Sequence, residues 1–167
     1  MSENYIVING KRTELTEEQL KQLGIETEKK RKNPFDRVAI NQDYHLINKF
    51  NRIDEYTEAD DCTDSALFDV CNYFNDTEFA KQVALHQLLY HKLLKFSYDN
   101  ECEDTAEWDG NNKHWAVRYD YACGMFATHY QSVYRAQEVY FSSEEGAKRA
   151  IKEVVEPFMK EHPEFVW

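Results

Sequence analysis

The chain has 167 residues, a length typical of one domain or two small ones. Hydrophobic residues make up 42% and aromatic residues 14% of it, which excludes an intrinsically disordered chain, because disordered segments hold few aromatics and little apolar surface to bury. Acidic residues outnumber basic ones by 31 to 20 and give a net charge of -11, which argues against direct binding to nucleic acid or to an anionic membrane.

The N-terminal segment begins with residues typical of a small hairpin. Residues 5–8 are an apolar run that ends in Asn9-Gly10, the strongest short hairpin signal, and residues 11–15 are expected to form the returning strand. A capping box at Thr16 predicts a short helix to Leu23. We therefore expect a hairpin and a short helix within residues 1–25.

A basic linker is predicted next. Residues 26–33 contain no apolar side chain, four successive cations stand at 29–32, and Pro34 follows. Residues 26–34 are therefore expected to join the N-terminal segment to a main domain over residues 35–167. The first residues also lack the basic and apolar regions of a signal peptide, so we expect a cytoplasmic protein.

The first half of the main domain mixes strands and helices. Strand patterns cover 43–47 and 52–57, and a short helix is expected over 65–74 with Asp64 as its N-cap. A long helix is expected from Asn75 or Asp76 to Tyr98. Its apolar residues occupy more than one stripe, which predicts a central helix covered on most sides.

The second half is expected to complete an α+β fold. Three strands are predicted at 114–121, 125–134 and 138–141, followed by a helix from Ser142 or Ser143 to about Met159 that Pro157 should kink or end. The predicted architecture is an antiparallel, aromatic-rich sheet packed on the long central helix and on the C-terminal helix.

Motifs for cofactors, metals or covalent catalysis are lacking in the sequence. His86 and His91 are five residues apart, unlike the four-residue spacing of a helical zinc site. A calcium loop starting at Asp99 would need glycine at its sixth position and glutamate at its twelfth, where the chain has Asp104 and Gly110. The four cysteines form no Cys-x-x-Cys pair. We expect no cofactor, no metal site and no catalytic residue, and so not an enzyme.

The excess negative charge is confined to residues 36–110, which hold seventeen acidic and six basic side chains. Within that range, two acidic segments of eleven residues each contain no Lys or Arg. The first acidic segment, residues 54–64, contains Asp54, Glu55, Glu58, Asp60, Asp61 and Asp64. The second acidic segment, residues 99–109, contains Asp99, Glu101, Glu103, Asp104, Glu107 and Asp109.

Three interpretations of these segments remain open. If both converge on one face, their carboxylates mimic phosphates and bind Lys and Arg of a basic, nucleic-acid-binding protein. A second interpretation is that the acidic segments are solvated loops that keep the protein soluble. A third is that their carboxylates are ligands of a metal ion in a metal-dependent enzyme.

Residues 76–90 and 139–151 resemble segments of small acidic proteins encoded by phages and prophages of Firmicutes, and the similarity extends over roughly residues 34–158. Some small phage proteins of this general kind are anti-CRISPR inhibitors, which commonly bind the RNA-guided nuclease and block its DNA site. The resemblance implies a non-enzymatic inhibitor acting in the bacterial host cytoplasm, or else a phage accessory or structural protein. No short motif defines inhibition, so the resemblance assigns no site residue.

Overall fold

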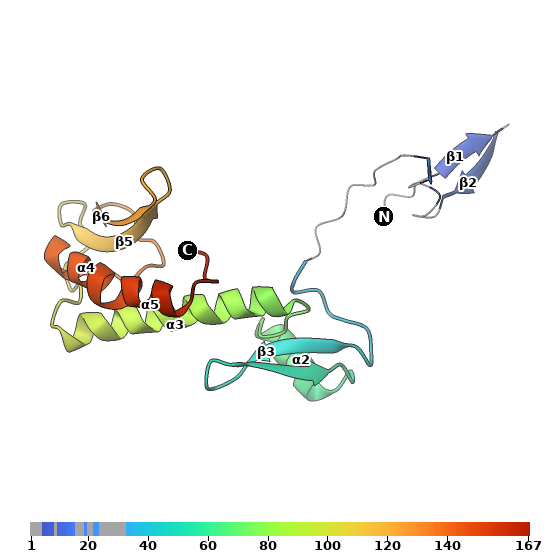
Figure 1. The fold of residues 1–167 in the computed structure, drawn as a ribbon, viewed down its shortest axis with the longest axis horizontal. Coiled ribbons are helices and arrows are strands. Elements are labelled where there is room, and N and C mark those ends of the chain that lie inside the picture. Colours follow the sequence, from blue (N-terminus) through green and yellow to red (C-terminus); the bar gives the residue numbers. More distant parts are fainter. Residues whose placement is uncertain (1–4, 9, 16–18, 20–21, 24–32) are drawn as a thin grey trace. The chain divides into compact units, whose positions relative to one another are not determined.

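The structure is a computed structural model that describes residues 5–8, 10–15, 19, 22–23 and 33–167 (Figure 1). It divides into two units, Met1–Asn33 and Pro34–Trp167. Helices and antiparallel strands occur together, so the predicted α+β class is confirmed. No helix within the described residues is long and apolar enough to cross a membrane.

The N-terminal unit contains the predicted hairpin. Strand β1 (Tyr5–Ile8) pairs antiparallel with β2 (Lys11–Glu14), and Ile8 lies opposite Lys11. Gly10 has a φ of 77°, the left-handed conformation that a tight hairpin turn requires. The predicted helix at 16–23 and the predicted linker at 26–34 lie largely outside the described residues.

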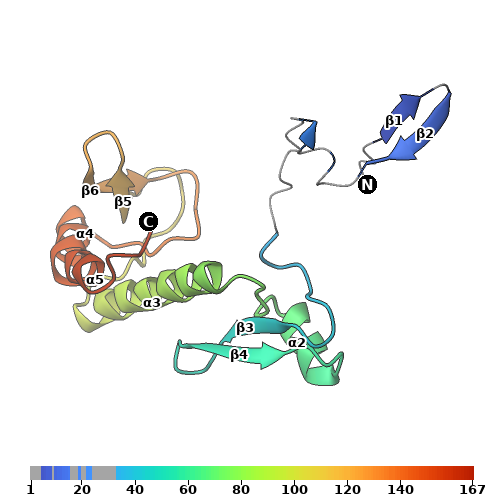
Figure 2. The same ribbon diagram turned by 45° about the vertical axis from the view of Figure 1, so that its right-hand side comes forward.

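The unit Pro34–Trp167 places its strands in two separate antiparallel pairs, β3–β4 and β5–β6. Its elements, in chain order, are β3 (Asp43–Ile47), β4 (Ile53–Thr57), α2 (Cys62–Asp69), α3 (Thr77–Asp99), β5 (His114–Asp120), β6 (Met125–Gln131), α4 (Glu144–Ala150), the π-helical turn η1 (Ile151–Val155) and α5 (Glu156–Glu161). Figures 1 and 2 show β3, β4 and α2 near the first turns of α3, and α4 and α5 beside its later turns.

Helix α2 begins three residues earlier than predicted. Its N-cap is Asp61, whose side chain accepts hydrogen bonds from the backbone N–H groups of Thr63 and Asp64. Asp64 is the third helical residue and accepts a bond from the Asp61 N–H in return, which completes a capping box. The prediction of Asp64 as the N-cap is wrong, because Asp61 is the N-cap and Asp64 is its partner in the capping box.

Helix α3 begins and ends close to the predicted positions. The Asp76 side chain accepts a bond from the Phe79 N–H at 2.9 Å and caps the helix, which then continues for 23 residues to Asp99. The prediction of coverage on most sides is wrong, because only one stripe of α3 is buried. The buried apolar residues of that stripe are Ala80, Ala84, Leu85, Leu89, Leu93 and Phe96.

The main hydrophobic core lies between the C-terminal part of α3, the β5–β6 hairpin and the C-terminal helices. Its members beyond α3 are Cys102, Val117, Val139, Phe141, Ala147, Ala150, Val155, Phe158 and Phe165. A second, smaller cluster of Tyr44, Leu46 and Tyr73 lies beneath β3 and α2. The antiparallel, aromatic-rich β5–β6 pair therefore packs on α3 and on the C-terminal helices.

One C-terminal prediction needs correction. Residues 138–141 form no third strand, and only Phe141 makes isolated bridges, to Trp115 and to Glu103. The last helix continues past Pro157 to Glu161, two residues beyond the predicted end near Met159. A π-helical turn, Ile151–Val155, directly precedes the part of the helix that contains Pro157.

Candidate partner-binding surfaces

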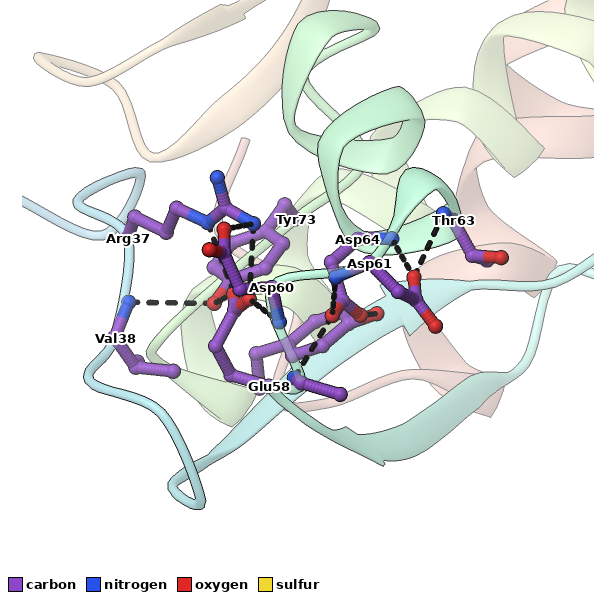
Figure 3. Close-up of polar contacts among 10 residues, drawn as sticks. Arg37, Val38, Glu58, Asp60, Asp61, Thr63, Asp64 and Tyr73 are labelled. Atoms are coloured by element: carbon purple, nitrogen blue, oxygen red, sulfur yellow. Dashed lines mark hydrogen bonds and ion pairs between the residues drawn. The ribbon is translucent and has the colours of Figure 1, made fainter.

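The first acidic segment follows β4 and enters α2, and it divides into buried and exposed carboxylates. Glu58 and Asp64 are only 2% and 3% exposed, so they are not available to a partner. This corrects the expectation that the whole segment forms a binding face. Their burial is the consequence of specific partners from elsewhere in the chain, which Figure 3 shows.

Glu58 forms a bidentate ion pair with Arg37. The guanidinium donates from Nε to Oε2 at 3.0 Å and from Nη2 to Oε1 at 2.9 Å. The Tyr73 hydroxyl donates to Oε2 at 2.7 Å, and the Asp60 N–H donates to Oε1 at 2.8 Å. The hydrogen bonds from Arg37, and after them those from Tyr73 and the backbone, lower the pKa of Glu58 although burial acts in the opposite direction. Burial, followed by the hydrogen bond to Glu58, raises the pKa of Tyr73 to about 12.

Asp64 is held in a comparable way. Backbone N–H groups of Ala59 and Asp61 donate to Oδ2 at 2.8 and 3.2 Å, and the Tyr44 hydroxyl donates to Oδ1 at 2.7 Å. These bonds, that from Ala59 foremost, lower the pKa of Asp64 despite burial. The rings of Tyr44 and Tyr73 stack at 4.0 Å, so one aromatic pair joins both carboxylate sites.

Glu55, Asp60 and Asp61 remain exposed, and we call them the first acidic surface. Glu55 and Asp60 side chains are each 66% exposed. Asp60 lies 3.2 Å from the Arg37 guanidinium, but that cation is already engaged by Glu58, so the surface keeps a net negative charge. The sixth residue of the segment, Asp54, accepts a hydrogen bond from Asn48.

Aromatic side chains accompany this surface. Tyr56 is 49% exposed, and its ring lies 6.2 Å from that of Tyr44. Phe68 on α2 is also exposed, and its ring contacts Tyr73 at 5.6 Å. The buried tyrosine pair therefore packs against two exposed aromatic rings, and aromatic residues are enriched at protein interfaces.

The second acidic segment follows the C-terminus of α3. Four of its residues are exposed: Asp99, Glu101, Glu107 and Asp109. Asp99 forms an ion pair with Lys95 one turn earlier on the helix. The side chain of Asp109 accepts backbone N–H bonds from Asn111 and Asn112, which lower its pKa. This carboxylate therefore closes a turn rather than extending freely into solvent.

The remaining two carboxylates of the second segment, Glu103 and Asp104, point inward. Asp104 Oδ2 lies 2.6 Å from Nδ1 of His114, and the His114 side chain is fully buried. The His114 ring stacks on Trp108 at a centroid distance of 3.6 Å. In the sequence, nothing distinguishes these two carboxylates from the other four of the segment, and no local pattern links His114 to Asp104.

The two acidic segments are not brought together. The first lies near the first turns of α3 and the second follows its last turn (Figure 1). A helix of 23 residues spans about 34 Å at 1.5 Å per residue, so the residues that enter α3 and those that leave it are that far apart. The expectation that they converge on one face is therefore wrong, and the protein has two separate acidic surfaces.

Among residues 5–8, 10–15, 19, 22–23 and 33–167, no three His, Cys, Asp or Glu residues are grouped so that they could hold a metal ion. All four cysteines are free thiols, and only Cys102 is buried. Burial raises the pKa of Cys102 and opposes formation of its reactive thiolate.

Comparisons with known proteins found no relative of this chain. No family model matches the chain, and neither a curated protein nor a solved structure is significantly similar to it.

Proposed function

We propose that this protein is a non-enzymatic binding protein that occupies a basic, nucleic-acid-binding site on a partner protein. The observation that carries the proposal is the first acidic surface, where Glu55, Asp60 and Asp61 stay exposed and the nearby cation Arg37 is already paired with Glu58. Carboxylates accept charge-assisted hydrogen bonds from Lys and Arg as phosphates do. A site built for nucleic acid therefore offers the complementary chemistry.

Contact with a protein is favoured over contact with small cations. Tyr56 and Phe68 are exposed, and the Phe68 ring lies 5.9 Å from the guanidinium carbon of Arg37, the residue that contacts Asp60. Large aromatic side chains supply most of the binding energy at many protein interfaces. The resemblance to small phage proteins directs the proposal to a host enzyme that handles nucleic acid, foremost an RNA-guided nuclease. Inhibition would then follow from competition with DNA or RNA for the same basic site.

The experiment is affinity capture from a nuclease-treated bacterial lysate, followed by mass spectrometry. The wild-type chain is expected to capture a basic, nucleic-acid-binding protein that added duplex DNA releases. The test variant combines Glu55→Gln, Asp60→Asn and Asp61→Asn. These changes remove three charges but keep a good helix cap at 61 and a residue type that tolerates the φ of 59° at 60.

A matched control removes three exposed charges elsewhere, with Glu156→Gln, Glu161→Gln and Glu164→Gln near the C-terminus. We expect the test variant to lose the captured protein and the control to retain it, because screened charges far from the interface contribute little. Equal capture by both variants, or capture of a protein that neither DNA nor RNA releases, would refute the proposal.

A further inference from the structure

A small cavity beside the second acidic segment has the lining expected of a cation site. Its volume is about 270 Å³, and residues from the later turns of α3, from 103–108 and from 135–140 surround it. Glu103, Asp104 and Glu138 contribute carboxylates to the lining, so we call it the carboxylate pocket. Four aromatic side chains also line it: Tyr90, Tyr98, Trp108 and Tyr140.

Trp108 is the most firmly held wall of the carboxylate pocket. The His114 ring covers one of its faces, with an interplanar angle of 7°, and the Tyr140 ring meets it edge-on at 5.0 Å. The guanidinium carbon of Arg135 lies over the Trp108 ring, 5.8 Å from its centroid. The pocket therefore already places a guanidinium from its own chain on a fixed aromatic surface.

One carboxylate oxygen of a residue that lines the pocket lacks a hydrogen-bond partner among the described residues. Oε2 of Glu103 is enclosed by protein and has no hydrogen-bond partner among the described residues. The Asp104 carboxylate is already engaged by His114. Arg135 forms no ion pair within the part of the chain that the structure describes, although it lines the same cavity. An enclosed carboxylate oxygen without a donor is costly, and a bound cation would remove that cost.

We propose that the carboxylate pocket receives an arginine side chain of the partner protein. The incoming guanidinium stacks on Trp108 in place of Arg135 and donates a hydrogen bond to Glu103. A planar guanidinium can stack on Trp108 and donate a hydrogen bond to Glu103 at the same time, whereas a lysine ammonium is a point charge that cannot stack. This inference rests on the proposed function, because a basic partner is the source of the arginine.

The test uses the purified full-length chain and Nα-acetyl-arginine N-methylamide, a blocked arginine that carries no charge other than its guanidinium. Binding is followed by NMR through the indole N–H signal of Trp108. We expect saturable binding with a selective shift of this signal. The uncharged citrulline analogue, which has the same shape, is expected to leave the signal in place.

Three variants are expected to change the affinity for the probe in different ways. Glu103→Gln keeps the shape but removes the charge, and it should weaken binding about tenfold, the usual effect of losing one charge-assisted hydrogen bond. Arg135→Ala should strengthen binding several-fold, because the probe no longer competes with a guanidinium of the same chain. Glu101→Gln removes a neighbouring exposed charge outside the pocket and should leave the affinity unchanged within about twofold.

Failure of this inference is distinguishable from failure of the proposed function. The pocket assignment is overturned if neither the wild-type chain nor Arg135→Ala binds the probe, or if Glu101→Gln weakens binding as much as Glu103→Gln. The capture experiment changes only Glu55, Asp60 and Asp61, none of which lines the pocket. Capture that depends on those residues would support the proposed function whatever the probe does.

Discussion

Removing one hydroxyl group tests how the buried carboxylates are stabilised. Tyr44→Phe deletes the group that donates to Asp64 Oδ1 at 2.7 Å, while the stacking on Tyr73 and the backbone donors to Oδ2 remain. A hydrogen bond to a charged group contributes about 1.5–3 kcal/mol. For a protein of this size, that loss corresponds to a fall in Tm of about 3–12 °C.

The assay is urea unfolding of wild type and variant at neutral pH, followed by circular dichroism, with the Tm measured in parallel. Tyr56→Phe is the matched control, because it removes the same atom from an exposed ring and should change the free energy of unfolding by less than about 0.5 kcal/mol. Equal effects of the two substitutions would refute the reasoning, since the Tyr44 hydroxyl would then contribute no more than one in contact with water.

Two further predictions concern titration and thiol reactivity. Folding lowers the pKa values of Glu58 and Asp64, so both carboxylates stabilise the folded protein. This contribution is complete above the pKa values of about 4 in the unfolded chain, and it is lost as the pH falls through the lower pKa values in the folded protein. The Tm should therefore be nearly constant from pH 7 to about 5 and fall below about pH 4, and an unchanged Tm at pH 3 would contradict this. Ellman's reagent should modify three thiols of the native protein and reach Cys102 only in denaturant; rapid reaction of all four would contradict its burial.

Elements with a local signal were predictable from the sequence. The Asn9-Gly10 turn fixes the first hairpin, and Asp76 in front of a long helical pattern fixes the start of α3. Predictions went wrong where two local rules competed. Asp61 and Asp64 both suit an N-cap, and only their reciprocal bonds decide between them. The last helix ends at Glu161, close to the predicted Met159, but no feature of the sequence predicts the π-helical turn that precedes Pro157.

The inward-facing carboxylates were not predictable, because their partners are distant in sequence. Glu58 pairs with Arg37 across 21 residues, and Asp64 meets Tyr44 across 20. Nothing near either carboxylate distinguishes it from its exposed neighbours. One signal was available: a tyrosine in an apolar strand needs a partner for its hydroxyl once it is buried, and an acidic segment in the same domain is a natural source of acceptors.

The separation of the acidic segments, in contrast, was implied by the predicted helix itself. A helix from about 76 to 98 holds its own two ends about 34 Å apart, so a segment that precedes it and one that follows it start from different ends. The second segment stays beside the later turns of α3, because Cys102 and Asp104 are anchored against Ser142 and His114 and because residues 103–108 line a cavity together with Tyr90 and Tyr98.

This separation bears on the partner that we propose. A partner that engages both acidic segments must have a basic channel long enough to reach from one to the other. A partner with a shorter basic patch can engage only one surface at a time. For such a partner, the exposed aromatics beside the first acidic surface and the carboxylate pocket beside the second would be separate anchors rather than parts of one site.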